Sequence, residues 1–148
     1  LLSQSKINLY IYIINFFVSI LMGSMIFFTT VVSPTTFQTL KNKDSSNFLR
    51  SIFPKLFLFG FIISILSLLI SLFINNLIIT ILLTFVTLSF LYNRNFLTPL
   101  INKFRDMELT GDKVAKKKFK LMHFLSVFLF IVNFLLLSCI LIINYNNF

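Results

Sequence analysis

Four long apolar runs, separated by short polar stretches, dominate the chain. They lie at about residues 7–32, 53–74, 77–97 and 119–143. A helix needs about 20 apolar residues to cross the hydrocarbon core of a bilayer, and every run is long enough. The pattern therefore predicts an all-α fold, an integral membrane four-helix bundle in which residues 1–148 form a single domain. Residues 33–52 and 98–118 are the longer connections, and Asn75-Asn76 is a tight uncharged turn.

Local signals predict where these helices begin and end. Pro34 is expected to end the first span, and Ser45 to cap a short surface helix before the chain enters the membrane at Pro54. Thr98-Pro99 is typical of an N-cap followed by proline in the first helical turn, so we expect a kink or a restart there. Asp112 is expected to cap the last helix.

Small and weakly polar residues recur at helical spacing in each span. Such residues favour helix contacts in lipid, because they allow close approach and interhelical hydrogen bonds. One stripe is therefore expected to face the bundle in each span. The four stripes, in span order, are Asn15, Ser19 and Gly23; Gly60, Ser64, Ser67 and Ser71; Thr80, Thr84 and Thr87; and His123, Ser126 and Asn133.

Positive charge is distributed unevenly between the two sides of the predicted bundle. Of the 13 Lys and Arg residues, Lys6 alone lies on the side that carries both termini and the Asn75-Asn76 turn. Loops rich in Lys and Arg stay in the cytosol. We therefore expect the two longer connections to be cytosolic and both termini to lie outside, in a bacterial cytoplasmic (inner) membrane.

Composition supports this class and excludes others. The chain is 57% hydrophobic and 11% charged, which leaves too little polar surface to cover a soluble domain. The net charge of +9 alone would suggest nucleic acid, but the basic residues flank apolar runs, as membrane orientation requires. We therefore predict contact with anionic lipid headgroups and no nucleic-acid partner. The single Cys139 cannot form an internal disulfide.

His123 is the only histidine and the one candidate for cofactor binding. It is a weak candidate ligand for haem or a metal, because a haem between transmembrane helices usually has two axial ligands and no second His is present. Cys139 lies about 24 Å farther along the same helix, too far to share a metal with it. No cofactor is therefore predicted, and His123 is more simply a polar residue at the end of a span.

Four polar residues within the spans are candidates for a functional role: Asn15, Arg94, Ser126 and Asn133. Arg94 lies near the cytosolic end of its span, where a long side chain can extend to the headgroups. Asn15 and Asn133 lie deeper and favour interhelical hydrogen bonds. No carboxylate lies within a span and no catalytic constellation is found, so we expect a protein that is not an enzyme.

Several ordered motifs resemble a known family. They are Met22-Gly23 through Ser33-Pro34-Thr35 and Phe37; Phe53-Pro54 followed by Leu58-Phe59-Gly60; and Pro99, Ile101-Asn102, Arg105-Asp106, Phe119, His123, Ser126-Val127 and Asn133. Over about residues 17–137 the chain resembles the transmembrane protein 205-like family, whose bacterial members are a domain of unknown function. Members often carry Trp just before the first-span Gly, whereas Leu21-Met22 precedes Gly23 here. The resemblance implies an integral membrane protein without an established enzymatic activity.

The family-like motifs converge at the basic end of the predicted bundle. This cluster contains Pro34, Phe37, Phe53, Pro54, Pro99, Arg105, Asp106 and His123. We expect any site to lie there, and the leading hypothesis is a small membrane protein that binds a protein or lipid partner at its cytosolic face. Two alternatives stay open: a haem- or metal-handling redox module centred on His123, and a small-solute permease working as a homo-oligomer.

Overall fold

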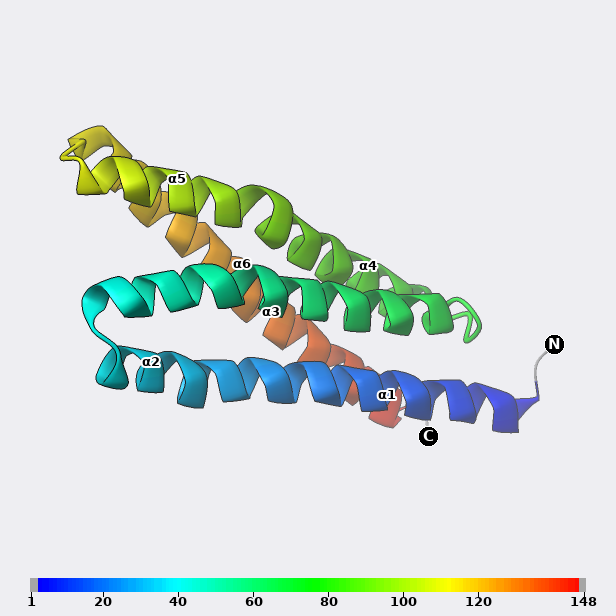
Figure 1. Ribbon diagram of the computed structural model, residues 1–148. Helices are drawn as coiled ribbons and strands as arrows, with labels where there is room; N and C mark the ends of the chain where they lie inside the picture. Colours follow the sequence, from blue (N-terminus) through cyan, green and yellow to red (C-terminus); the bar gives the residue numbers. More distant parts are fainter. Residues whose placement is uncertain (1–2, 147–148) are drawn as a thin grey trace.

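The computed structural model describes residues 3–146, and of Asn146 it describes the backbone alone. Those residues form helices and no strand, and four continuous helices are long and apolar enough to cross a membrane (Figure 1). The predicted all-α membrane bundle is confirmed. In chain order the elements are α1 (Gln4–Phe27), η1 (Phe28–Val32), α2 (Ser33–Thr39), α3 (Asn42–Ser71), α4 (Leu77–Tyr92), η2 (Asn93–Leu97), α5 (Thr98–Leu109) and α6 (Lys113–Asn146).

The first and third spans each continue through a wide π turn instead of ending at proline. The turn η1 joins α1 to α2, and η2 joins α4 to α5, so these helices extend over Gln4–Thr39 and Leu77–Leu109. Proline lacks an N–H and its ring crowds the carbonyl four residues earlier. The wider turn just before each proline leaves room for the ring. The expected end at Pro34 is therefore wrong. Of the kink or restart expected at Thr98-Pro99, the restart is wrong as well.

Of the predicted caps Ser45 and Asp112, only Asp112 caps a helix. Ser45 lies inside α3, where its Oγ donates to the carbonyl of Asn42, so the expected separate surface helix is the beginning of α3. Asp112 caps α6 as predicted, since its Oδ1 accepts from the backbone N–H groups of Val114 and Ala115 at 2.8 and 3.0 Å.

The Asn75-Asn76 turn reverses the chain between α3 and α4 as expected. Asn75 adopts a left-handed conformation with φ of 51°, which asparagine tolerates better than most residues. The side chain of Asn76 then accepts from the N–H of Ile79 at 3.2 Å and caps α4. A turn of this kind needs no charged residue, and the beginning of α1 lies at the same end of the bundle (Figure 1).

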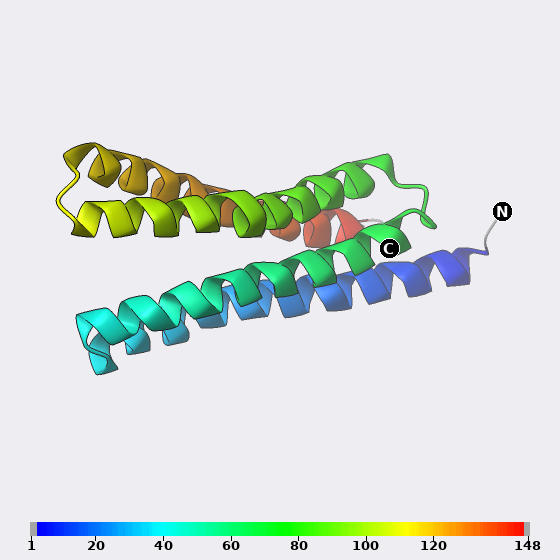
Figure 2. The ribbon, with the colours of Figure 1, turned by 45° about the horizontal axis from the view of Figure 1, so that its top comes forward.

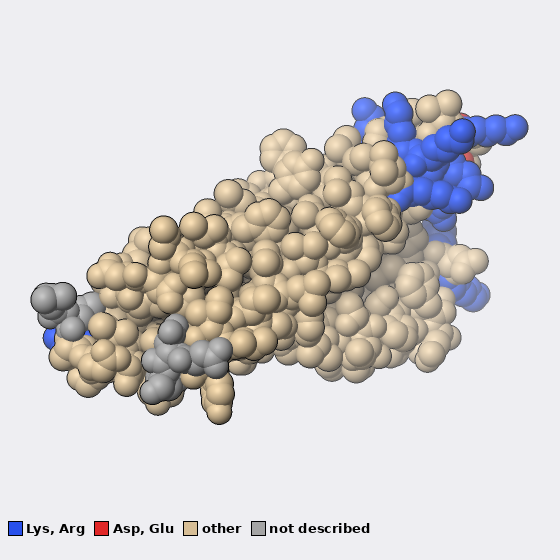
Figure 3. Space-filling view, turned by 180° about the vertical axis from the view of Figure 1, so that it is seen from behind, with Lys and Arg blue, Asp and Glu red and all other residues tan. Residues whose placement is uncertain are grey.

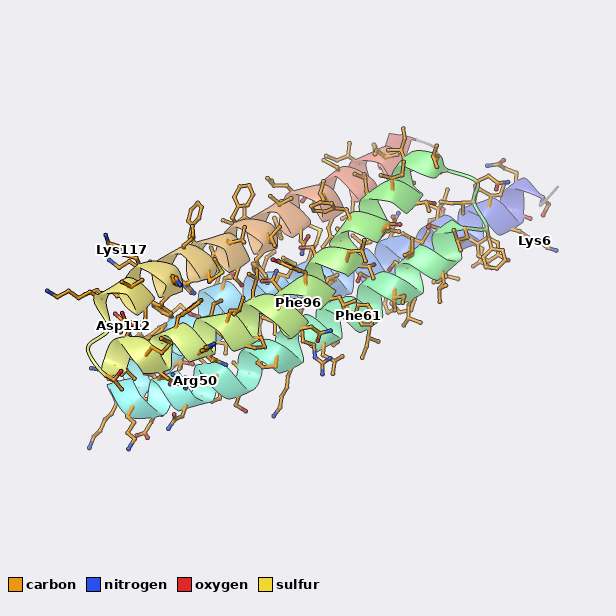
Figure 4. The ribbon with its side chains drawn as sticks, turned by 90° about the horizontal axis from the view of Figure 1, so that it is seen from above. Lys6, Arg50, Phe61, Phe96, Asp112 and Lys117 are labelled. Carbon is orange, nitrogen blue, oxygen red and sulfur yellow. The ribbon has the colours of Figure 1, made fainter. Side chains whose placement is uncertain are left out.

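The helices pack as two layers that separate toward one end. α1 lies beside α3, and α4 and α5 lie beside α6, while α3 also packs on α4 and α1 on α6 (Figure 2). Lys and Arg gather at the end where the layers separate, which we call the basic end (Figure 3). Arg50, Asp112 and Lys117 lie there, whereas Lys6 lies at the opposite, closed end (Figure 4).

The small-residue stripes fulfil their prediction in some helices and fail in another. Gly60, Ser64, Ser67 and Ser71 are buried on α3, and Ser71 hydrogen bonds to Thr80 of α4 at 3.1 Å. On the first span, Ser19 and Gly23 are exposed at the bundle surface, so the expectation that they face the bundle is wrong. Larger apolar side chains fill that contact instead, and they are Ile11, Ile14, Val18, Leu21 and Met25.

Candidate functional site

A cleft of about 740 Å³ opens at the basic end, between the two diverging layers. One wall is formed by η1, α2 and the beginning of α3, and the other by α5 and the beginning of α6. Its volume lies in the range of ligand pockets, which is about 300–1,000 Å³. The cleft is therefore large enough for a small molecule or a portion of a lipid.

Aromatic side chains form the deep part of the cleft. Phe28 and Phe53 lie with ring centroids 5.2 Å apart, and Phe53 stacks on Phe57 at 6.0 Å. Phe57 in turn meets the buried Phe90 at 6.5 Å, directly above Gly60. These offset ring contacts stabilise one another beyond their buried area and give the cleft an apolar floor.

Cationic side chains lie on both walls near the opening. Arg50 of α3 donates to the Asp106 carboxylate of α5 at 2.6 Å, and this ion pair bridges the two walls on one side. Arg105 of α5 pairs with Glu108 at 2.6 Å, and its guanidinium also lies 5.3 Å from the centre of the Phe119 ring. The pairing and the ring contact together hold Arg105 in one orientation.

His123 follows Phe119 by one turn on α6 and stacks on its ring. Its ring is nearly parallel to Phe119, with centroids 5.9 Å apart and an interplanar angle of 13°. His123 lines the cleft and is exposed. No group of three or more His, Cys, Asp or Glu side chains is placed to hold a metal ion within residues 3–146.

The cleft opens sideways on the side away from the Arg50–Asp106 pair. There, η1 packs on α1 and α2, and α2 packs on α3. Within the described chain, the backbones of η1 and α2 do not approach those of α5 or α6 closely. Phe28 and Phe37 on one wall thus face His123 and Phe130 on the other with no helix between them. In a bilayer this gap would face the lipid tails and headgroups.

A buried hydrogen bond connects η2 to α6 beside the cleft. The Ser126 Oγ of α6 donates to the Asn93 Oδ1 of η2 at 2.6 Å, and both residues are buried. In the π turn the Asn93 carbonyl accepts from the backbone N–H of Thr98 and also from the Thr98 hydroxyl, at 2.8 Å. Wide turns of this kind often occur at functional sites, and this one positions α5 beside the cleft.

The predicted motif residues do not all reach the cleft. Phe37, Phe53, Arg105, His123 and Ser126 line it. Pro54, Arg94 and Pro99 instead border a shallower hollow of about 470 Å³ on the outside of α3 and α5. Asp106 lies in the ion pair with Arg50, and Pro34 is exposed on α2.

The two deeper asparagines lie away from the cleft. Asn15 is at the closed end, where its Oδ1 accepts from the Asn144 side chain at 2.6 Å. Asn133 is fully buried on α6, and neither polar atom of its side chain has a hydrogen-bond partner in the described residues. The interhelical hydrogen bond expected of Asn15 is present, and the one expected of Asn133 is not.

Two important residues were absent from the predicted site. Arg50 counts in the sequence only as one of the charges that indicate orientation. Its place on α3, one turn before Phe53, puts it on the same helical face as that ring. Asn93 lies beside the charged Arg94 in the sequence, and the prediction named Arg94 alone. An uncharged amide at the end of an apolar run was the available signal for Asn93.

Residues 16–109 match the model of a family described as Domain of unknown function (DUF4149). The match covers more than half of the 148-residue chain, so the chain belongs to this family. The expectation of a family of unknown function is confirmed, whereas nothing links that family to transmembrane protein 205. No curated protein and no solved structure matches the chain.

Proposed function

We propose that this member of the family is a non-enzymatic protein that binds a lipid, by taking an acyl chain into the cleft at its basic end. The observation that carries the proposal is the sideways opening between α2 and α6, which leads to an aromatic floor. An apolar cleft open to the bilayer would exchange its content with lipid tails without passing them through water. A lipid partner therefore suits the cleft better than a water-soluble ligand does.

The surroundings of the cleft agree with a place at the level of the headgroups. Along α3, which runs from the basic end into the bundle, the cleft lining changes from the polar Asn42, Ser45 and Ser46 to the aromatic Phe53 and Phe57. A lipid presents the same sequence of chemistry, from polar headgroup to apolar tail. The match in polarity along the cleft supports a lipid over a purely apolar or purely polar ligand.

The proposal includes the orientation of the chain in a bacterial cytoplasmic membrane. Lys and Arg concentrate at the basic end, which by the positive-inside rule faces the cytosol. The cleft would then take lipid from the inner leaflet. A reporter that works only in the cytosol should be active when fused within the turn at 110–112 and inactive when fused after residue 148, and the reverse result would overturn this orientation.

Single-tryptophan variants provide a direct test of lipid entry, because the chain contains no Trp. Phe130→Trp places the indole on the cleft wall of α6, and Phe128→Trp places it two residues away on the outer surface, where Phe128 is exposed. The protein is reconstituted in vesicles that contain increasing fractions of a phospholipid with brominated chains, which quench Trp fluorescence on contact.

The cleft position should report a bound chain that the outer position does not. We expect the quenching of Phe130→Trp to saturate at a low fraction of brominated lipid, because a site fills before the bulk does. Quenching of Phe128→Trp should rise steadily with the bulk fraction. Parallel curves for the two variants would contradict lipid binding in the cleft.

A permease is the second candidate, and one observation favours it. Ser89 and Asn133 lie buried on the helices α4 and α6, which pack together, and their side chains include buried polar atoms without partners in the described chain. Water or a small polar solute would satisfy such atoms. A solute flux in liposomes that Asn133→Leu abolishes would support this candidate over lipid binding.

A further inference from the structure

The described residues that line the cleft include basic side chains and no acidic ones, which indicates the chemistry of its ligand. Arg50 and Arg105 reach it from opposite walls, and His123 lies on the third helix that borders it. Within the described chain, no Asp or Glu side chain lines the cleft. A ligand that carries a negative charge would therefore meet cations and neutral donors in the lining, while the carboxylates paired with Arg50 and Arg105 lie outside it.

Arg50 retains donors for a second anion although it already forms an ion pair. A guanidinium has five N–H groups in a planar fork, and the bond to Asp106 uses one nitrogen of Arg50, Nη2. The Arg50 side chain is 29% exposed and that of Asp106 is 61% exposed, so the carboxylate lies on the solvent side of the pair. The remaining donors of Arg50 are available on the cleft side, since Arg50 lines the cleft and Asp106 does not.

Arg105 on the opposite wall also forms an ion pair that uses only part of its donors. Its Nη1 donates to Glu108, and its planar face rests against Phe119, which leaves its other donors at the edge of the cleft. Arginine forks match the oxygens of phosphate in geometry as well as in charge. Two such groups on facing walls suit the phosphate of a lipid whose chain occupies the aromatic floor.

We propose that the cleft selects an anionic phospholipid, with the headgroup phosphate between Arg50 and Arg105, because the described cleft lining contains no carboxylate to bind the ammonium of a zwitterionic headgroup. The proposal rests on the proposed function, because it requires an acyl chain in the cleft. Asp106 then has a defined role: it is an internal anion that competes with the phosphate for Arg50. The Arg50–Asp106 pair therefore connects α3 to α5 when no lipid is bound, and it opposes headgroup binding.

This role predicts effects of opposite sign for the two partners of one ion pair. Arg50→Gln removes the headgroup ligand and should weaken binding of a brominated anionic phospholipid by about tenfold, the effect of losing a charge-assisted hydrogen bond. Asp106→Asn removes the competitor and should strengthen binding by about threefold, a smaller effect because the exposed carboxylate competes only partly. Binding is measured by quenching in the Phe130→Trp background.

Matched controls separate the site from general electrostatics. Lys55→Gln removes one positive charge from α3, and Asp44→Asn removes one negative charge from the same helix; both residues are exposed and neither lines the cleft. At about 0.5 M salt the Debye length is about 4 Å, so distant charges have little effect. Each control should therefore change binding less than twofold, which is roughly the residual effect of a screened surface charge.

Four outcomes decide the matter. Opposite shifts for Arg50→Gln and Asp106→Asn, with unchanged controls and normal helix content by circular dichroism, support the headgroup site. Weaker binding by both variants overturns it and makes the ion pair a structural link. Equal binding of anionic and zwitterionic brominated lipids overturns the headgroup selection while the proposed lipid binding survives. Absence of saturable quenching with either lipid overturns both.

Discussion

The closed end and the basic end of this bundle are built from the same four helices, yet they differ in packing. At the closed end, apolar side chains from several helices are fully buried against one another, among them Ile14, Leu83, Leu137 and Ile140. At the basic end, the same helices diverge around a cleft of about 740 Å³. One end thus holds the fold together, and the other has room for a ligand.

The contrast follows from the energetics of association in lipid. Lipid tails are as apolar as Leu, so helices gain little from hiding apolar surface and depend on close packing and hydrogen bonds. Tight packing in one region can therefore stabilise the fold while another region stays open. Gly60 lies in close contact with Phe90, and the Phe90 ring meets Phe57 of the aromatic floor.

The largest expected difference between the two ends comes from a matched pair of Leu→Ala substitutions. Leu83 is fully buried at the closed end, whereas Leu49 is half-buried and lines the cleft. Leu83→Ala should lower the free energy of unfolding by about 2 kcal/mol, near the low end of soluble cores because the transfer contribution is small in lipid. Leu49→Ala enlarges a space that already exists and should cost less than about 0.5 kcal/mol.

Unfolding of the purified protein in detergent, followed by circular dichroism, measures both effects. Equal losses for Leu83→Ala and Leu49→Ala would mean that the basic end is packed as tightly as the closed end. That result would contradict an open cleft at the basic end.

Much of the fold could be predicted from the sequence because its signals are local. The apolar runs determine the spans, the Asn75-Asn76 pair marks a turn, and Asp112 lies where a cap is needed. The sequence did not predict the π turns, because a Ser-Pro or Thr-Pro pair is typical of a helix boundary. The helix continues past the proline only where the hydrogen-bond register shifts just before it. That shift depends on the neighbouring helix, as the Asn93–Ser126 bond illustrates.

The candidate site was predicted in part. Charge placement located the correct end, and Phe37, Phe53, Arg105 and His123 do lie together there. Which face of a helix turns inward was harder to predict, because lipid does not penalise apolar side chains on the outside. For the same reason, the stripe of Ser19 and Gly23 on the first span turned out to face outward.

The boundary between the two ends can be tested with a second matched pair. A Cβ at Gly60 would lie 2.6 Å from two ring carbons of Phe90, and that ring is itself fixed against Phe57. Gly60→Ala should therefore destabilise the protein by about 1–2 kcal/mol, as overpacking does. A Cβ at Gly23 meets nothing within 4 Å, so Gly23→Ala should gain about 0.5 kcal/mol from helix propensity.

Thermal unfolding midpoints in the same detergent give the sign of each change. A stabilised Gly60→Ala protein would show that Phe90 moves easily into the cleft above it. The closed end would then begin deeper in the bundle than the ring contacts indicate, and the aromatic floor would be adaptable.

The smallest of the three expected contrasts concerns two buried asparagines, one on η2 and one on α6. Asn93 accepts from Ser126 and donates to the carbonyl of Ser89, whereas Asn133 is equally buried with no partner for either polar atom among the described residues. Asn93→Leu should cost about 1 kcal/mol, a typical value for interhelical hydrogen bonds in membranes. Asn133→Leu should cost nothing or stabilise slightly, because it removes an amide that nothing satisfies.

The sign of the Asn133→Leu effect also separates the two candidate functions. If unfolding shows a loss comparable to that of Asn93→Leu, the Asn133 amide must have a partner in the membrane, and water is the simplest one. A hydrated interior between α4 and α6 would favour a solute pathway. If the substitution is neutral and the quenching of Phe130→Trp remains saturable, the interior below the cleft is dry, and the ligand enters and leaves through the lateral opening.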